Sequence, residues 1–384
     1  MSKRSVHLYP TSFLHETRIL RVSRTLIEHK AFECVLVVAA LRDSGASELE
    51  EFSESCTVWR VPTFCKRSGT IRKICNIIEW SLRALIKLQA TNYDCISAHS
   101  LSVLPVAWLA SALRGAHLIY EPHEIETETT ETGGLRGKLS KVVERVLITR
   151  ADAFILTSNG HKEWYENNYG CKHGTVVRNT PYKYIDQSHE SVFRAKFAIP
   201  ESHLIFLYQG AITVPRGIDI LLQVFSRLEK RFHIVFMGFG ADVAKVIQKT
   251  KCYSNIHYMT AVHPDNLRHY TSGADVGIHM MDSSCVNHLY ALPNKPMEYM
   301  NAGIPAVVSD LPEMGKLITE SGGGWVVPVN DAASLQSLIE GMTSADIAAK
   351  REFAKQWALA NYWEKEKLKL LQVYQRLGYA CVLE

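Results

Sequence analysis

One segment in the second half of the chain combines a sharp turn with a permanent positive charge. Residues 208–217, Tyr-Gln-Gly-Ala-Ile-Thr-Val-Pro-Arg-Gly, follow an apolar run and precede a helical pattern. Gly210 allows the backbone to turn, and Arg216 brings a planar guanidinium to the expected helix start. A guanidinium beside free helix N–H groups suits a diphosphate. An ordinary strand-to-helix loop with a surface arginine has the same spacing, so both interpretations stay open here.

A second anion-binding candidate surrounds Lys295. Residues 289–305 are Leu-Tyr-Ala-Leu-Pro-Asn-Lys-Pro-Met-Glu-Tyr-Met-Asn-Ala-Gly-Ile-Pro. Pro296 is typical of a first helical turn and Gly303 of a helix end, so the preceding loop would bring Lys295 and free N–H groups together. Glu298, in that first turn, can accept hydrogen bonds from a ribose diol. The alternative is a carboxylate that only complements the helix dipole.

Histidines follow two expected strands in the first half. Residues 119–124, Ile-Tyr-Glu-Pro-His-Glu, place His123 and Glu124 at a strand end, where they can bind a polar group or transfer a proton. His99 follows residues 95–98 in a similar position. A lone loop histidine is more often a solvated or capping residue, so this pattern is weak by itself.

Two glycines, Gly238 and Gly240, follow another expected strand. The residue three positions after Gly240 is Val243, so the third glycine of the dinucleotide fingerprint is missing. The turn therefore favours close backbone packing over NAD binding. Since no intact Gly-x-Gly-x-x-Gly opens either half of the chain, an NAD-dependent oxidoreductase is disfavoured.

Short apolar runs alternate with helical patterns along the whole chain. Because the runs are apolar on both faces, they predict buried parallel strands in a doubly wound α/β fold. The expected strands are 5–9, 34–40, 95–98, 118–121, 153–157, 204–208, 233–237, 276–279 and 305–309. The expected helices include 18–30, 104–114, 218–230, 297–302 and a final stretch at about 348–375.

The length of 384 residues exceeds what one hydrophobic core usually supports, which predicts two domains. Polar segments with proline punctuate residues 179–203, and each side carries its own strand–helix series. We therefore expect an N-terminal domain at 1–180 and a C-terminal domain at 181–360. The last segment, about 361–384, is expected to join the first domain.

Composition excludes several classes of protein. The net charge of +4 is weak and the basic residues are spread along the chain, so nucleic-acid binding is not expected. The nine cysteines form no Cys-x-x-Cys pair, which argues against a zinc site or a disulfide framework and favours a reducing cytoplasm. No apolar run approaches the length of a membrane span.

Together these segments resemble the retaining glycosyltransferases of the GT-B fold, in the large GT4 group. The strongest match is residues 275–310, with Ala-Asp-Val-Gly-Ile-His, Leu-Pro-Asn-Lys-Pro-Met-Glu-Tyr-Met and Ala-Gly-Ile-Pro-Ala-Val-Val-Ser-Asp in order. Further matches are Gly-Ala-Ile with Arg-Gly-Ile at 210–218, Val-Phe-Met-Gly-Phe-Gly, Gly-Gly-Gly-Trp-Val-Val-Pro at 322–328 and Tyr-Glu-Pro-His-Glu at 120–124. His15-Glu16-Thr17-Arg18 resembles the first loop of the family.

The resemblance implies two Rossmann-like domains that face each other across a cleft, with the last helix crossing back to the first domain. It places a nucleotide-diphosphate-sugar in the C-terminal domain, with Glu298 on the ribose hydroxyls and Arg216 near the diphosphate. His123 would lie near the donor sugar, and the acceptor would bind mainly in the N-terminal domain. We also assign Gly210 and Gly238 to the donor side. On the acceptor side we expect His15, His99 and Glu124.

One position departs from the family pattern. The first glutamate of its E-x7-E motif is replaced by Tyr290. Recognition of the sugar would then pass to the backbone of the following residues, Ala291, Leu292 and Asn294, together with Lys295. The departure leaves the identity of the sugar open.

The resemblance implies transfer with retention of configuration. We expect Arg216 and Lys295 to neutralise the leaving diphosphate, with no metal or other cofactor taking part. A UDP-sugar is favoured as donor, and a glycan or lipid-linked acceptor would suit cell-surface polysaccharide assembly. Basic amphipathic residues 66–88, with help from 136–150, could dock on an anionic membrane at its cytoplasmic face. They could equally form a core-facing helix with a solvated basic side.

Two other functions fit the same sequence. A non-hydrolysing nucleotide-sugar epimerase shares the fold and the donor, but it would change the sugar without an acceptor. A non-catalytic partner subunit of a transferase complex would explain Tyr290 and would bind the donor weakly or not at all.

Overall fold

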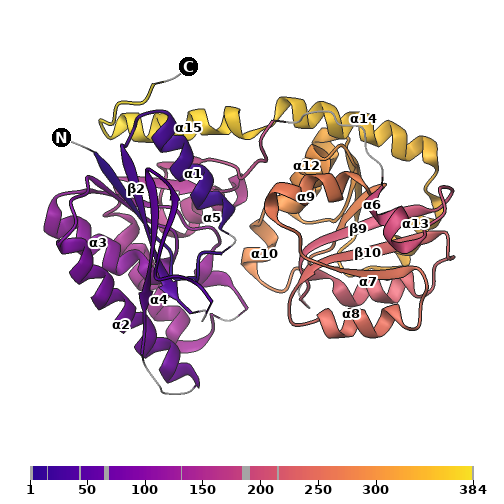
Figure 1. Cartoon of the computed structure of the whole chain (residues 1–384), viewed down its shortest axis with the longest axis horizontal. Coiled ribbons are helices and arrows are strands. Elements are labelled where there is room, and N and C mark those ends of the chain that lie inside the picture. The colour runs from indigo at the N-terminus through magenta and orange to yellow at the C-terminus, as the bar shows by residue number, and fades with distance from the viewer. Residues whose placement is uncertain are drawn as a thin grey trace. The chain divides into compact units, whose positions relative to one another are not determined.

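The computed structural model describes residues 3–14, 16–42, 45–64, 69–130, 132–183, 191–213 and 216–382, with side chains omitted for 69–74. The chain divides into two compact units, residues 1–178 with 366–384, and residues 179–365. Each unit is an α/β body built on its own sheet (Figure 1). The sequence placed its boundary at 180/181 and assigned the final segment from about 361 to the first domain.

The first unit contains an eight-stranded sheet in the order β3-β4-β2-β1-β5-β6-β7-β8. Every pairing is parallel except β3–β4, which is antiparallel at one edge. The strands are β1 Arg4–Leu8, β2 Cys34–Leu41, β3 Leu49–Ser53, β4 Cys56–Pro62, β5 Cys95–Ala98, β6 His117–Tyr120, β7 Ala153–Leu156 and β8 Gly174–Val176. The helices are α1 Thr17–Glu28, α2 Gly69–Gln89, α3 Leu104–Arg114, α4 Gly134–Ile148, α5 Asn159–Tyr169 and α15 Trp363–Arg376.

The second unit contains a six-stranded parallel sheet in the order β11-β10-β9-β12-β13-β14. Its strands are β9 Leu204–Ala211, β10 Phe232–Phe239, β11 Ile256–Thr260, β12 Val276–His279, β13 Ala306–Ser309 and β14 Gly324–Val327. Its helices are α6 Val192–Phe197, α7 Ile218–Phe225, α8 Val243–Thr250, α9 Pro264–Ser272, α10 Val286–Tyr290, α11 Asn294–Asn301, α12 Pro312–Ser321, α13 Ala332–Gly341 and α14 Ser344–Ala360.

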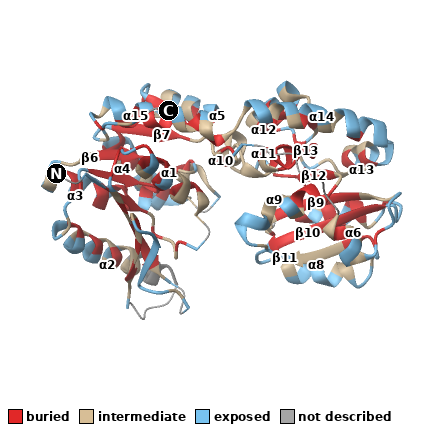
Figure 2. Ribbon diagram, turned by 45° about the horizontal axis from the view of Figure 1, so that its top comes forward, coloured by how far each residue is buried: buried red, intermediate tan, exposed pale blue. Residues whose placement is uncertain are grey.

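Both faces of the central strands are buried, as their apolar sequences predict. Along β9, Phe206 and Tyr208 belong to one hydrophobic core, whereas Ile205 and Leu207 belong to another on the opposite face. Figure 2 shows the strands of both units in red between helices whose outer sides are exposed. A residue that packs on either face must be apolar, which gives the continuous apolar runs of the sequence.

Two helix predictions differ from the structure. The expected helix at 218–230 ends earlier, at Phe225, where a turn leads into β10. The expected final helix is two helices, because Asn361 takes an extended conformation and the N–H of Trp363 donates to the carbonyl of Pro181 at 2.8 Å. A bond to a distant part of the chain thus sets the start of α15.

Among the described residues, no helix is both long and apolar enough to cross a membrane. The eight described cysteines are all free thiols.

Candidate active site

Lys295 lies over the carboxyl end of β9, in contact with Gly210. A Cβ atom added at Gly210 would come 2.7 Å from Lys295 Cε and 3.4 Å from its Nζ. Gly210 also has φ of +110°, which side-chain-bearing residues rarely adopt. The backbone conformation therefore favours glycine here, and a larger residue would also displace the end of the Lys295 side chain. Removal from water lowers the pKa of Lys295; the carboxylate of Glu298 opposes this shift and the Arg216 guanidinium adds to it.

Glu298 is held in place by a hydrogen-bonded glutamine at the end of β9. Gln209 Nε2 donates to Glu298 Oε2 at 2.7 Å, and Gln209 Oε1 accepts from Thr271 Oγ1 at 2.7 Å. The backbone N–H of Gln209 donates to the hydroxyl of Tyr299, which itself donates to the carbonyl of Ile278, each at 3.2 Å. These bonds join α11 to the ends of β9 and β12, so the carboxylate has a fixed position.

Arg216 lies just before α7, and its positive charge affects Lys295. The adjacent Gly217 has φ of +71°, and a Cβ there would come 2.4 Å from Met280 Cβ, so the start of α7 is pressed against the end of β12. The charge of Arg216 contributes to the lowered pKa values of both Lys295 and His279. The structure thus brings together Gly210, Arg216, Lys295 and Glu298.

His279 is a site residue to which the sequence analysis gave no role. It ends β12, is fully buried, and neither ring nitrogen has a hydrogen-bond partner among the described residues. Burial, and then the charges of Lys295 and Arg216, lower its pKa well below the usual value, so the ring is neutral. A buried polar group without a partner is unusual. The sequence feature that could have revealed His279 is a histidine at the end of an otherwise apolar strand.

Gly238 lies beside Gly210 for a structural reason. A Cβ at Gly238 would come 1.8 Å from the carbonyl oxygen of Gly210, and one at Gly240 would come 2.4 Å from that of Ile212. Close approach of β10 to β9 therefore accounts for both glycines, as the interpretation without NAD predicts.

Four predicted site residues lie in the segment that leads from the end of α10 into α11. Tyr290 ends α10, Ala291 and Leu292 lie in the link, and Asn294 begins α11. All four are half-buried. α11 begins without a side-chain cap, so its first N–H groups are available beside Lys295. Two cations, a helix start and a fixed carboxylate can together hold an anion and an adjacent diol.

In the first unit, His7, His99 and His123 form a hydrogen-bonded row at the carboxyl ends of β1, β5 and β6. His7 and His99 are buried, and His123 is half-buried. His123 Nε2 lies 3.2 Å from His99 Nδ1, His99 Nε2 lies 2.7 Å from His7 Nδ1, and His7 Nε2 lies 3.3 Å from Ser5 Oγ. Burial lowers the pKa of His123 to about 3 and that of His7 to about 4. All three rings are therefore neutral at pH 7.

A buried ion pair borders this histidine row. Arg18 Nε donates to Glu121 Oε1 at 2.7 Å, and both side chains are at least 95% buried. Arg18 Nη1 and Nη2 and Glu121 Oε2 have no hydrogen-bond partner among the described residues, and Glu121 Oε2 lies 3.8 Å from His99 Nδ1. The sequence analysis quoted Arg18 only as part of a loop motif and missed its pairing with Glu121.

The row ends in a polar pocket of about 330 Å³. The lining residues follow the ends of four strands, β1, β2, β5 and β6: Tyr9, Pro10, Thr11, Arg42, His99, Ser100, His123, Glu124 and Glu126. Burial raises the pKa of Glu126 to about 7, although hydrogen bonds from the N–H of Leu101 and from Ser100 oppose the shift. The predicted residues His99, His123 and Glu124 thus share one pocket, while His15 lies outside the described residues.

His99, Glu121 and His123 also offer ligand atoms within 4.8 Å of one another, a spacing that metal ions use. The chemistry of this set fits a metal poorly. One carboxylate oxygen already accepts from Arg18, whose guanidinium would repel a cation, and the two histidines are bonded to each other. The arrangement fits a relay of neutral hydrogen bonds.

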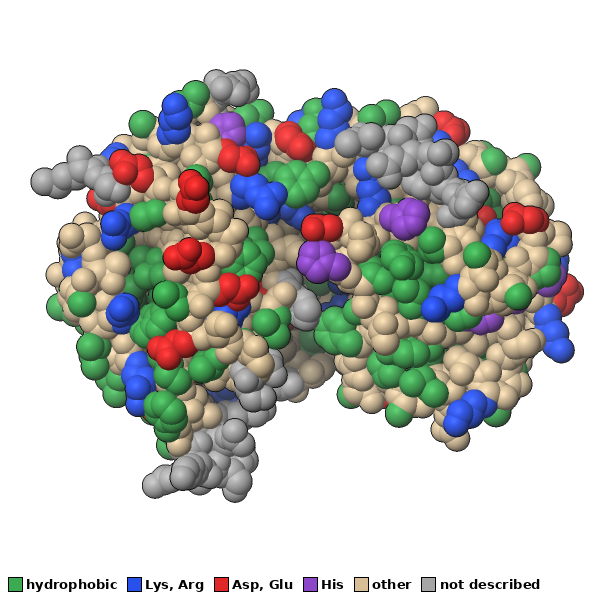
Figure 3. Space-filling model, in the orientation of Figure 1, with side chains coloured by type: hydrophobic (Ala, Val, Ile, Leu, Met, Phe, Trp, Pro, Cys, Tyr) green, Lys and Arg blue, Asp and Glu red, His purple; other side chains and the backbone are tan. Residues whose placement is uncertain are grey.

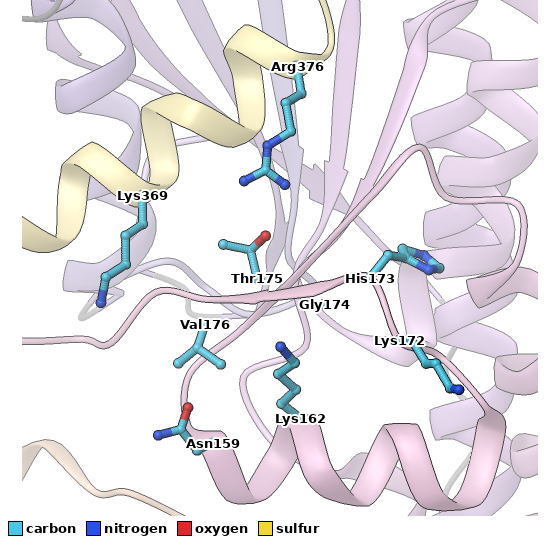
Figure 4. A pocket seen from close by; sticks show the side chains of 9 residues that line it. All are labelled: Asn159, Lys162, Lys172, His173, Gly174, Thr175, Val176, Lys369 and Arg376. Atoms are coloured by element: carbon cyan, nitrogen blue, oxygen red, sulfur yellow. The ribbon is translucent and has the colours of Figure 1, made fainter.

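A second pocket of the first unit, of about 450 Å³, contains no predicted site residue. Figure 4 shows Lys162 from α5 together with Lys369 and Arg376 from α15 around strand β8. Lys162 Nζ lies 3.8 Å from Glu166 Oε1, and Lys369 Nζ lies 2.8 Å from Glu366 Oε1. Two of these three basic side chains, Lys162 and Lys369, are therefore already close to carboxylates of the same chain.

Both units match family models. Residues 15–180 match the model described as glycosyl transferase 4-like domain, and residues 203–344 match that described as glycosyl transferases group 1. No curated protein sequence matches the chain.

Solved structures of the same fold span nearly the whole chain. Sucrose-phosphate synthase from Thermosynechococcus elongatus is 14% identical with a TM-score of 0.81, and 98% of this chain and 99% of that one are covered. HepE from Anabaena, in complex with UDP-glucose, is 13% identical with a TM-score of 0.74 over 98% and 99%. WaaG, a glycosyltransferase involved in lipopolysaccharide biosynthesis, is 14% identical with a TM-score of 0.68 over 96% and 98%.

These structures share the GT-B fold, in which two Rossmann-like domains follow one another along the chain. The two family models together match most of both units, including Lys295 and His123. The chain is therefore a glycosyltransferase of the GT-B fold.

Proposed function

We propose that the protein is a retaining, metal-independent GT4-type hexosyltransferase that uses a UDP-sugar. The observation that carries the proposal is the cluster of Arg216, Lys295 and Glu298 around Gly210, where two cations and a fixed carboxylate meet at one strand end. HepE, which has the same fold, binds UDP-glucose, and this supports UDP as the nucleotide.

The diphosphate would lie against Lys295 and Arg216. Negative charge grows on its oxygen as the bond to the sugar breaks, so fixed cations stabilise the transition state more than the ground state. Removal of one fixed donor of this kind typically costs about 2.7–4 kcal/mol in the barrier. A bound diphosphate would also favour the charged form of Lys295 and offset its lowered pKa. With two cations supplied by the chain, a metal ion is not needed for charge balance.

Glu298 would hold the ribose. Gln209 fixes Oε2 of its carboxylate at 2.7 Å, so Oε1 is the oxygen that would accept from a ribose hydroxyl. The neutral, unpartnered ring of His279 at the end of β12 would complete the polar lining of this site. With Tyr290 in place of the first glutamate of the motif, backbone groups of Ala291–Asn294 and Lys295 would contact the sugar.

The pocket of the first unit would receive the acceptor. Its hydroxyls, carboxylates and neutral imidazoles suit a polyhydroxylated ligand. The pKa of His123, about 3, makes its neutral form an orienting group, and the leaving phosphate would take the acceptor proton. We further propose a glycan or lipid-linked acceptor, used at the cytoplasmic face of a membrane in polysaccharide assembly.

Calorimetric titration with UDP, GDP and ADP in the presence of EDTA tests the donor site. We expect saturable binding of UDP that is lost in Glu298→Ala and kept in Glu320→Ala, which removes an exposed glutamate of α12. Binding that requires a divalent metal would contradict metal independence. Equal binding by both variants would contradict the role of Glu298.

Product analysis separates the remaining alternatives. Conversion of a UDP-sugar to its epimer without an acceptor would favour an epimerase. Failure to bind any nucleotide would favour a non-catalytic subunit. Retention is tested by the anomeric configuration of the product once an acceptor is found.

A further inference from the structure

Helix α4 carries an exposed apolar stripe between basic side chains. Its apolar positions are strongly exposed: Leu135 by 85%, Leu139 by 64%, Val142 by 59% and Val146 by 54%. Their spacing places them on one side of the helix. Every exposed charged residue of α4 is an arginine or lysine, and its only acidic residue, Glu144, is buried.

The neighbouring helix α3 has an exposed face with almost no charge. Trp108, Leu109 and Leu113 are exposed by 37%, 38% and 60%. Its single charged residue, Arg114, is hydrogen-bonded to Asn92 and to the carbonyl of Gln89. An outer helix face usually carries several charged residues, so this face is unusual for a helix in contact with water.

Helix α2 continues the same surface. Ile78, Leu82 and Ile86 are exposed by 54%, 57% and 72% at intervals of one turn. Arg83 and Lys87 lie among them, and Glu79 is paired with Arg83 at 3.0 Å. α3 packs against both α2 and α4. Figure 3 shows hydrophobic side chains at the surface on the side of this unit where Figure 1 draws α2 and α3.

We infer that the exposed side of α2, α3 and α4, here called the apolar face, docks on an anionic lipid bilayer. The inference deepens the proposed function, since it names the surface that would bring a lipid-linked acceptor to the enzyme. Basic side chains around an apolar surface match lipid headgroups above acyl chains. The sequence analysis named 66–88 and 136–150, and the structure adds α3 as the uncharged centre.

The charges argue against a second copy as the occupant. If two apolar faces met, Arg136, Lys138 and Arg145 of one molecule would lie near the same basic set of the other. The described part of the face has one accessible carboxylate, Glu79, which already pairs with Arg83. Desolvated like charges oppose association, whereas an anionic surface satisfies them.

Vesicle sedimentation without nucleotide tests the apolar face. The full chain is mixed with vesicles of phosphatidylcholine alone or with phosphatidylglycerol, at low and high salt. We expect binding to the anionic vesicles that weakens in salt. Arg136→Gln with Arg145→Gln should weaken binding by roughly fivefold per side chain. Leu135→Gln with Leu139→Gln should weaken it roughly fivefold or more at both salt concentrations.

Matched controls alter the same residue types elsewhere. Lys230→Gln with Lys251→Gln removes two exposed cations of the second unit, and Ile247→Gln with Leu359→Gln removes two exposed apolar groups. These variants should bind vesicles like the wild type. All variants should keep UDP binding by calorimetry, so loss of docking is distinct from failure of the donor site.

Three results would overturn the inference. The first is no binding to anionic vesicles. The second is binding that the α4 variants leave unchanged. The third is a concentration-dependent dimer in sedimentation velocity that Leu135→Gln with Leu139→Gln abolishes, which would assign the face to a second copy.

Discussion

Gln209 Nε2 donates a 2.7 Å hydrogen bond to Glu298 Oε2, so the last residues of a buried strand set the position of a carboxylate 89 positions away in the chain. Gln209 is itself held by Thr271. The glutamine is buried and does not need to touch a ligand to affect its binding. It acts by positioning Glu298.

Gln209→Leu should therefore weaken UDP binding while the fold is kept. Loss of one such hydrogen bond to a charged group corresponds to about 1.5–3 kcal/mol, or roughly a tenfold to hundredfold rise in Kd. Calorimetry measures this value, and Gln209→Glu should be worse because two carboxylates would then meet. The control is Gln336→Leu, which breaks an exposed Gln336–Glu340 bond of 2.9 Å on α13. If both leucine variants bound UDP equally well, the positioning role would be wrong.

Gly210→Ala should displace Lys295. The new methyl group would come 2.7 Å from Lys295 Cε, so the end of the lysine side chain must shift, and the backbone φ of +110° would be strained. We expect a large loss of UDP affinity that UMP, which lacks the second phosphate, shows to a smaller degree. Gly115→Ala is the matched control, because Gly115 has φ of +71° but open space around its Cβ position. The control should lose about 1–2 kcal/mol of stability, the cost of the left-handed conformation for a residue with a Cβ atom, and no affinity.

Glu121→Gln should destabilise the first unit strongly. It leaves Arg18 buried without its counter-charge, and breaking a buried pair from one side costs about 3–5 kcal/mol. Arg83→Gln breaks an exposed pair and should cost at most about 1 kcal/mol. Urea unfolding followed by circular dichroism compares the two. Similar costs would mean that Arg18 finds another partner when Glu121 is neutral.

The histidine row should make stability fall on acidification. The pKa of His7 is about 4 in the folded chain against 6.5 for an ordinary histidine, so the unfolded chain binds more protons between these values. The contribution of His7 to the free energy of unfolding is fully present above pH 6.5 and is lost as the pH falls towards 4. Glu126, whose pKa is raised to about 7, acts in the opposite direction.

His7→Gln isolates the histidine contribution, since Glu126 is the same in both proteins. The melting temperature should fall less between pH 7 and pH 5 in the variant than in the wild type. His263→Gln, at a histidine whose side chain is 71% exposed, should leave the wild-type slope unchanged. An unchanged slope in His7→Gln would show that the row does not govern the acid response.

The sequence predicted the central strands because their two buried faces leave a continuous apolar signal. Strands at or near the edges gave no such signal. Every residue of β3 is exposed, and β8 is three residues long and begins with glycine. Their pairing depends on neighbouring strands, which a local pattern does not report.

The Lys295 site was predicted further than the His123 pocket for a similar reason. Gly210 with Arg216, and Lys295 with Glu298, lie close together in the sequence and have recognisable types. Gln209 and Thr271 reach Glu298 only through the fold. In the first unit, the bonds of Arg18 to Glu121 and of His7 to His99 join residues 103 and 92 positions apart, so no spacing could reveal them.

The hydrogen-bonded row from Ser5 to His123 links the pocket to the buried interior of β1. Each neutral imidazole has one protonated and one bare nitrogen, so fixing one ring fixes the next. If His123 donates to His99, then His99 donates to His7, and His7 donates to Ser5; otherwise all three bonds run the other way. The four residues therefore have two states in total. A ligand that donates to His123 Nδ1 selects one state and a ligand that accepts from it selects the other. The direction in which the Ser5 hydroxyl proton points, in the buried strand β1, therefore depends on whether the ligand in the pocket donates to His123 or accepts from it.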